Sequence, residues 1–198
     1  NTAMSIYTAI IDLASPVKLN LTVLPEGLYD PLFQVMERKD TVAAYLRNSV
    51  SPYAITDSAK RVIDTISYSA VYSFPNAPGG SYYIVAKHFN SIETWSRSGG
   101  ELLSDNGTAY HYDFTIADSQ AYGNNLKLKG NEFCLFSGDV DQNGFIDLDD
   151  VIRISNEATN FTVGNYLPED LTGNGIVDLE DVTICYNNAV EFVNVIRP

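Results

Sequence analysis

Apolar and polar residues follow one another in short runs up to about residue 137, and this pattern predicts β-strands. The runs are rich in Val, Ile, Thr, Tyr and Phe and are separated by clusters of Gly, Pro, Asn and Asp. No part of this region has a sustained helical period. The expected strands are residues 17–24, 41–47, 61–64, 68–74, 82–88, 92–96, 110–115 and 125–129. Short strands in this number predict an all-β sandwich.

Turn-forming residues separate these predicted strands. Gly and Asn tolerate positive φ and Pro fixes its own φ, so clusters of these residues favour tight turns. Such clusters occupy residues 25–27, 75–80, 98–100 and 105–107, and residues 88–91 are expected to turn a hairpin. The spacing of the turns keeps every predicted strand short.

The first sixteen residues have an apolar pattern of their own. Met4, Ile6, Tyr7, Ile10 and Leu13 would suit a strand, yet they precede the first clear turn signal of the sandwich. We expect an N-terminal edge strand or an arm over residues 1–16. An arm that adds a strand to a neighbour's sheet would favour self-assembly over docking to a separate receptor, and the sequence leaves both open.

Four segments give the β-region a family resemblance. They are residues 41–46, residues 70–74, the turn at residues 78–80 and the strand at residues 81–86. Together they resemble the transthyretin-like, or Ig-like, sandwich found in secreted bacterial proteins. The resemblance implies an all-β sandwich over residues 17–137.

Composition and charge narrow the classes of partner. A hydrophobic content of 45% is ordinary for a globular protein. No apolar run approaches the roughly 18 residues that span a bilayer, and no signal-peptide pattern opens the sequence, so we expect a mature, soluble chain. Most of the net charge of −13 lies in residues 139–198, which hold twelve acidic residues against Arg153 and Arg197. Such a field repels nucleic acid and anionic membranes and favours divalent cations.

The acidic region contains a loop with the spacing of an EF-hand calcium site. Counting from Asp139, oxygen-bearing side chains fall at positions 1, 3, 5, 9 and 12, with Gly144 at position 6 and apolar Ile146 at position 8. Gly144 permits the positive φ that wraps such a loop and leaves the carbonyl of the next residue facing the metal. The predicted ligands of the first loop are Asp139, Asp141, Asn143, the Phe145 carbonyl, Asp147 and Asp150.

The same pattern returns thirty-one residues later, from Asp170 to Asp181. Matches such as Val151 with Val182 and Phe161 with Phe192 extend the repeat into the segments that follow, so two loop–helix units are duplicated. The predicted ligands of the second loop are Asp170, Thr172, Asn174, the Ile176 carbonyl, Asp178 and Asp181. The neutral Thr172 replaces a carboxylate, so the second of the two calcium ions is expected to bind more weakly.

Two loop–helix units without entering helices, each with Asp at position 12, resemble the dockerin module of cellulosomal and other secreted bacterial proteins. The resemblance covers residues 138–198. It implies two antiparallel helices folded by calcium, with exposed helix faces that dock a cohesin domain. Family members dock partly through loop positions 10 and 11, which here are Leu148-Asp149 and Leu179-Glu180. These pairs differ from the small hydroxyl residues frequent in cellulosomal dockerins and favour a different partner.

The cysteines and histidines offer weaker chemistry. Cys134 and Cys185 each sit among apolar residues, which favours buried free thiols over an interdomain disulfide. His88 and His111 have no metal ligand or triad partner at a meaningful sequence spacing, so we interpret them as ordinary strand or turn residues.

Neither catalysis nor sugar binding is favoured by the sequence. Asp113 with Asp118, or Asp57 with Asp64, could form an acid pair, but these residues lie beside turns and no cleft is evident, so we expect no enzyme. Trp95, with Tyr82, Tyr83, Tyr110, Tyr112 and Tyr122, could form a sugar-stacking platform, although packing is favoured.

The sequence therefore predicts a multi-domain, extracellular, non-catalytic chain. An arm or edge strand (1–16) precedes a β-sandwich (17–137) and a small α-helical, dockerin-like calcium module (138–198). The expected role is protein–protein docking or self-assembly, with a cohesin-like receptor or copies of the chain as partner. The alternative is a carbohydrate-binding accessory module of a system that degrades polysaccharides.

Overall fold

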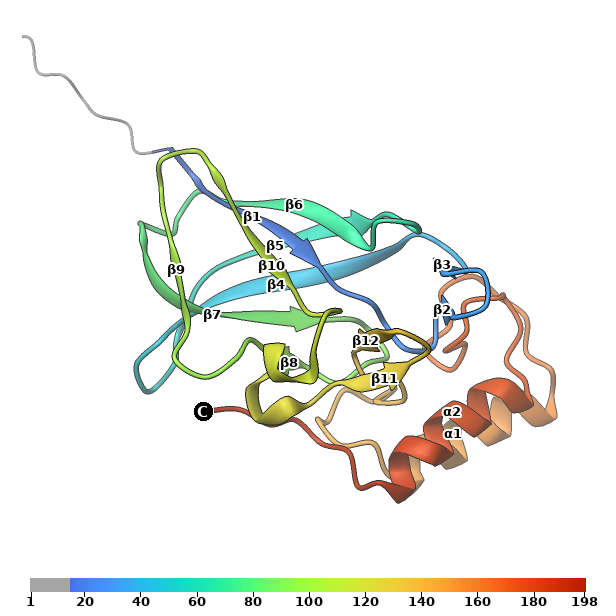
Figure 1. Ribbon diagram of the computed structural model, residues 1–198. Helices are drawn as coiled ribbons and strands as arrows, with labels where there is room; N and C mark the ends of the chain where they lie inside the picture. Colours follow the sequence, from blue (N-terminus) through green and yellow to red (C-terminus); the bar gives the residue numbers. More distant parts are fainter. Residues whose placement is uncertain (1–14) are drawn as a thin grey trace, which may run out of the picture.

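The computed structural model describes residues 15–198, in which a β-rich module is followed by two helices (Figure 1). The arm or edge strand predicted for residues 1–16 lies, apart from its last two residues, outside the described residues. Within the described part, no helix is long and apolar enough to cross a membrane.

One sheet of the β-rich module has three strands in the order β10–β1–β6. Strand β1 runs antiparallel to β6, with Leu19 opposite Tyr72, and parallel to β10, with Leu19 opposite Tyr110. Because β1 has one parallel and one antiparallel neighbour, this sheet is mixed. The strands are β1 (Val17–Thr22), β6 (Ser69–Phe74) and β10 (Ala109–Asp113).

The other large sheet has the order β5–β4–β7–β8, and β9 pairs with the free part of β7. All of its pairs are antiparallel. Its strands are β4 (Asp40–Asn48), β5 (Ile55–Ile63), β7 (Gly80–Lys87), β8 (Thr94–Trp95) and β9 (Glu101–Leu103). Two small hairpins, β2 (Tyr29–Asp30) with β3 (Val35–Met36) and β11 (Lys127–Lys129) with β12 (Glu132–Cys134), and two 3₁₀ turns, η1 (Asp118–Gln120) and η2 (Tyr122–Asn124), complete the module.

The main core lies between these two sheets. Alternate residues of β1, such as Leu19 and Leu21, are buried, and they join one cluster with Phe74 of β6, Leu46 of β4 and Ile84 of β7. Because inward-facing residues of both sheets share one core, the predicted sandwich is confirmed at the level of its layers. The narrower transthyretin-like assignment stays a prediction.

Several strands differ from the expected ones for physical reasons. Strand β5 begins at Ile55, six residues before the predicted start. Residues 56–60 were missed because all but Ala59 are polar and the strand lies on a sheet edge with little burial. Strands β2, β3, β9 and β12 were not predicted, since two- or three-residue strands are defined by their pairing partners rather than by a pattern. The run at 92–96 contains only the short strand β8.

The two helices are α1 (Leu148–Thr159) and α2 (Leu179–Val190). Each is preceded by an aspartate, Asp147 or Asp178, that caps the helix in a reciprocal capping box with Asp150 or Asp181. The first turn of each helix lies beside the last turns of the other, as expected for an antiparallel pair. A separate core lies beneath them and includes Ile146, Ile154, Leu171, Val177 and Cys185. Cys134 and Cys185 are buried and free, as the sequence favoured.

Candidate functional site

The first loop brings three carboxylates together. One oxygen from each of Asp139, Asp141 and Asp150 lies within 4.8 Å of the others, although up to eleven positions separate the residues in sequence. Gly144 adopts a φ of 91°, the left-handed conformation that the loop spacing required. In the described part of the chain, this is the one acidic group close enough to share a metal ion.

Backbone amides fix the orientation of these side chains. Asp139 Oδ2 accepts a hydrogen bond from the Gly144 amide at 3.2 Å. The two oxygens of Asp150 accept from the Val140 amide at 2.9 Å and from the Asp147 amide at 3.1 Å. These bonds hold Asp139 and Asp150 against the loop, with one oxygen of each close to an oxygen of Asp141.

Asp139 Oδ1 is independent evidence that the first loop suits a cation. Asp139 is only 2% exposed, yet this oxygen is buried with no hydrogen-bond partner. A buried, unpaired carboxylate oxygen is unfavourable unless a charged partner compensates for it. The first loop therefore fits a divalent cation that takes oxygen ligands.

The pKa values of the first loop agree with this geometry. Burial, together with the nearby charge of Asp150, raises the pKa of Asp139 to about 7. Burial also raises the pKa of Asp150, against the effect of the amides that donate to it. Both shifts mean that the ionised carboxylates are disfavoured when no cation accompanies them.

The second loop repeats the backbone scaffold but satisfies its first carboxylate differently. Asp170 Oδ2 accepts from the Gly175 amide at 3.0 Å, and Asp181 Oδ1 accepts from the Thr172 amide at 2.9 Å. Asp170 Oδ1 accepts from the Gly173 amide at 2.8 Å, and Arg38 Nη1 of the β-rich module lies 3.1 Å from Asp170 Oδ2. Each oxygen of Asp170 therefore has a hydrogen-bond donor. Asp170 thus lacks the buried, unpaired oxygen that indicates a cation at Asp139.

The second loop and α2 are joined to the β-rich module by buried polar contacts. The Glu26 carboxylate accepts hydrogen bonds from Asn188 Nδ2 on α2 at 2.6 Å and from the Ser137 amide at 3.2 Å. Asn90 Nδ2 donates to the carbonyls of Pro168 and Asp170. We call this contact region the module junction. Its partners are far apart in sequence, so no local pattern indicates it.

The acid–base behaviour of the junction can be tested at Glu26. Burial raises the pKa of this carboxyl group above its ordinary value. Because this pKa is raised in the folded state, Glu26 contributes most to the free energy of unfolding at pH values below its ordinary pKa of about 4.3. That contribution is lost as the pH rises through the folded-state pKa. Glu26→Gln keeps the size and an acceptor oxygen, so it is expected to lose less stability than the wild type between acidic and neutral pH. Urea unfolding at several pH values measures this difference.

Glu37→Gln is the matched control, because Glu37 is exposed. A Glu26→Gln variant whose pH dependence equals that of the wild type and of the control would contradict the assignment.

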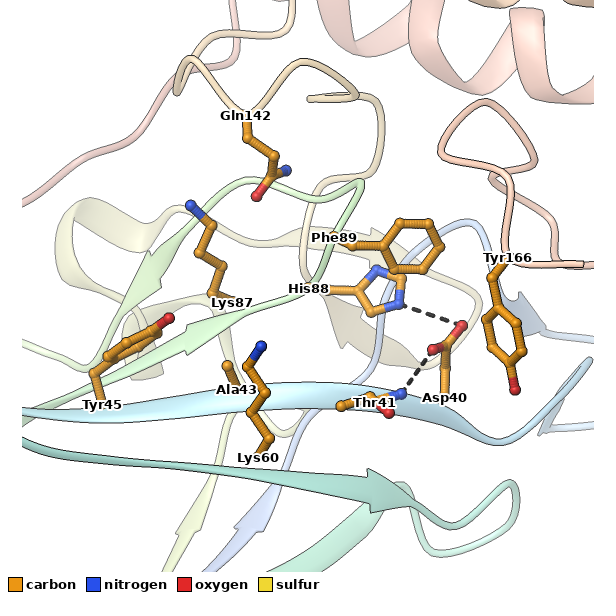
Figure 2. Close-up of a pocket in the computed structure, with 10 residues that line it drawn as sticks. All are labelled: Asp40, Thr41, Ala43, Tyr45, Lys60, Lys87, His88, Phe89, Gln142 and Tyr166. Carbon is orange, nitrogen blue, oxygen red and sulfur yellow. Dashed lines mark hydrogen bonds and ion pairs between the residues drawn. The ribbon is translucent and has the colours of Figure 1, made fainter.

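Beside the junction lies a pocket of about 570 Å³ on the β4–β7 side of the sandwich. Figure 2 shows Asp40 facing the ring of His88, with Tyr166 of the helical module across the pocket. His88 Nε2 lies 3.5 Å from Asp40 Oδ2 without hydrogen-bond geometry. Burial alone would raise the pKa of Asp40, but contacts with His88, the Thr41 amide and Arg38 lower it. His88, interpreted from sequence as an ordinary turn residue, is thus a buried partner of Asp40.

The proposed sugar platform is packed inside the protein. Trp95 is 2% exposed and contacts Tyr53 and Tyr83 edge-on, with the Arg47 guanidinium 5.0 Å from the centre of its ring. A ring in this position has no free face for a pyranose. The packing interpretation of Trp95, which the sequence favoured, is the one that the structure supports.

The solvent side of the two helices carries two apolar grooves. The first is lined by the start of α1 and the end of α2, and the second by the end of α1 and the start of α2. The residues of the second groove map onto those of the first through the 31-residue repeat, for example Leu179 onto Leu148 and Phe161 onto Phe192. Leu148 is 67% exposed and Leu179 75%, while the neighbouring Asp149 and Glu180 are exposed as well.

Comparisons with solved structures find the same arrangement of modules. One matching chain comes from the crystal structure of an N-terminal interface mutant of the type II cohesin–X–dockerin complex from Acetivibrio cellulolyticus. It is 16% identical to this chain, with a TM-score of 0.50 over 90% of this chain and 96% of the matching chain. A C-terminal interface mutant of that complex is also 16% identical, with a TM-score of 0.49 over 87% and 94% of the two chains. The likeness concerns the fold, a mainly β region followed by two helices, as in X-dockerin structures. No protein-family model and no curated protein matches the sequence.

Proposed function

We propose that this chain is a non-catalytic docking protein whose helical module binds a cohesin-like receptor. The observation that carries the proposal is the pair of repeat-related apolar grooves on the exposed side of α1 and α2. Contiguous exposed apolar surface of this kind marks interaction sites on soluble proteins. The solved complex of similar fold contains a cohesin, which supports a receptor of that type.

Four residues are the proposed centre of the contact. Leu148 and Leu179 would insert into the receptor as apolar anchors, since each projects from the first turn of its helix. Asp149 and Glu180 follow them and would form a charged rim. This surface belongs to the proposed domain 138–198, with 17–137 as its β-sandwich support and 1–16 as an arm or edge strand.

Calcium is the proposed cofactor of the helical module. In the first loop the ligands would be Asp139, Asp141, Asn143, the Phe145 carbonyl, Asp147 and Asp150. The corresponding residues of the second loop are Asp170, Thr172, Asn174, the Ile176 carbonyl, Asp178 and Asp181. Calcium would position the first loop at the start of α1 and so shape the docking surface. Acid-rich loops suit the millimolar calcium found outside cells, so the proposal includes an extracellular or cell-surface location.

The docking proposal predicts the effect of two charges on the grooves. In Leu148→Asp/Leu179→Asp, each new carboxylate would be desolvated against the receptor without a partner. Binding to type II cohesin domains in calcium is expected to weaken by about 30-fold or more, the loss of a hot spot of about 2 kcal/mol. Biolayer interferometry with a panel of such cohesins measures the change.

Leu102→Asp is the matched control, because Leu102 is 73% exposed on β9 of the other module. Equal binding by both variants would contradict the groove assignment, and no binding of any cohesin by the wild type would contradict the receptor class. Light scattering on the free chain distinguishes self-assembly from binding to a separate receptor. A polymer that is dispersed by the double variant would identify copies of the chain as the partner.

A further inference from the structure

Arg38 places a permanent positive charge against the second loop. Its side chain is 18% exposed and leaves the segment between β3 and β4. Nη1 lies 3.1 Å from Asp170 Oδ2 and donates to the Gly173 carbonyl at 3.3 Å. The guanidinium also lies 4.7 Å from the centre of the Tyr166 ring. The second loop therefore contacts Arg38 at its first carboxylate, at a backbone carbonyl and at the segment that precedes it.

The β-rich module holds Arg38 in this orientation. Arg38 Nε donates to Asp40 Oδ2 at 3.1 Å, and Asp40 is itself fixed by the Thr41 amide and by contact with the buried His88. An arginine keeps its charge at every pH at which the protein is folded. The series of contacts His88–Asp40–Arg38–Asp170 thus holds the positively charged guanidinium of Arg38 in a fixed orientation against the second loop.

The first loop has no equivalent. Within residues 15–198, no basic side chain lies at ion-pair distance from Asp139, and its Oδ1 is buried without a partner. The first loop also offers four ligand carboxylates (Asp139, Asp141, Asp147, Asp150), whereas the second offers three (Asp170, Asp178, Asp181). Calcium affinity in such loops depends on the number of ligand charges. Arg38 lowers the effective negative charge of the second loop still further.

We propose that Arg38 is a permanent counter-ion of the second loop. Because of this charge, the loop keeps its fold and its contacts at the module junction without a metal. On this inference the chain binds one calcium ion tightly, at the first loop, and binds any second ion much more weakly. The duplicated loops then have different roles: the first responds to calcium, and the second attaches the helical module to the β-rich module. The inference rests on the calcium assignment of the first loop and is independent of the receptor.

Calorimetric titration of the full chain with calcium tests the inference. The wild type is expected to show one tight ion, which Asp139→Asn removes and Asp170→Asn leaves in place. In Arg38→Met, which retains length without charge, the second loop is expected to gain calcium affinity by about tenfold or more, because one opposing charge near its ligands is gone. Arg38→Lys is the control, since it keeps the positive charge and is expected to show little gain.

The possible results separate the two proposals. Two equally tight ions in the wild type, with no change in Arg38→Met, would overturn the role of Arg38 while leaving the calcium assignment intact. No calcium binding by the wild type or by Arg38→Met would overturn both. If Arg38→Met does not fold, native mass spectrometry of the wild type and Asp170→Asn still counts the tight ions, and loss of a tight ion in Asp170→Asn would refute the inference.

Discussion

Asp139→Asn is expected to lower the stability of the protein in calcium and to raise it in EGTA. In calcium the variant loses a ligand of the first loop, and with it the stabilisation of about 3 to 4 kcal/mol that a ligand present at several hundred times its Kd supplies. In EGTA the wild type holds Asp139, Asp141 and Asp150 within 4.8 Å without a compensating charge. An asparagine amide removes one of these charges and can donate to a neighbouring carboxylate. Urea unfolding in each buffer measures both effects.

The change of sign between the two buffers is what distinguishes a metal site from a structural role. A variant less stable than the wild type in both buffers would contradict the assignment, since that result describes simple damage to the loop. Asp149→Asn is the matched control, because Asp149 is exposed, lies in the same module and carries the same charge. It is expected to change stability by less than about 0.5 kcal/mol in either buffer.

Gly27→Ala is expected to disrupt the module junction. A Cβ atom at Gly27 would lie 2.2 Å from the carbonyl oxygen of Leu171, next to the first residue of the second loop. The obstacle is backbone, so it cannot move aside as a flexible side chain would. Overpacking of this kind costs about 1 to 3 kcal/mol or more, and the cost here is expected at the upper end. Urea unfolding followed by circular dichroism, with calcium present, measures the loss.

The control for this substitution is Gly80→Ala on β7. There the nearest atom to a new Cβ would be the Tyr82 hydroxyl oxygen at 3.4 Å, an ordinary contact at the end of a side chain. If Gly27→Ala were as stable as Gly80→Ala, the close backbone approach at the junction would not be a feature of the protein in solution.

Local patterns were sufficient for the parts of the fold that depend on neighbouring residues. Strand β1 alternates buried and half-buried positions, as its sequence predicts. The polar edge strand β5 was cut short and the small strands were missed, because their existence depends on which backbone lies alongside. The parallel pairing of β1 with β10 is likewise a choice between distant segments that strand propensity does not encode.

In the candidate site, too, local features were predicted and long-range contacts were missed. The spacing of Asp139, Asp141 and Asp150 predicted a shared cation, because ligands within one loop are positioned by local backbone geometry. The same reasoning predicted a second, weaker site, because Thr172 stands where the first loop has a carboxylate. It missed Arg38, which reaches Asp170 across 132 positions of sequence. It also missed the pairing of Glu26 with Asn188, which spans 162 positions.

The sequence by itself determined the duplicated loop–helix units, the acidic first loop and the alternating strands such as β1, since each follows from a pattern within a few residues. The sequence showed that the second loop has one ligand carboxylate fewer, but only the tertiary structure decided that a basic side chain lies against it. The β-rich module brings the partly buried guanidinium of Arg38 to Asp170 and leaves Asp139 Oδ1 without a partner. The physical reason is that a counter-ion acts through space over a few ångströms, whichever part of the chain supplies it.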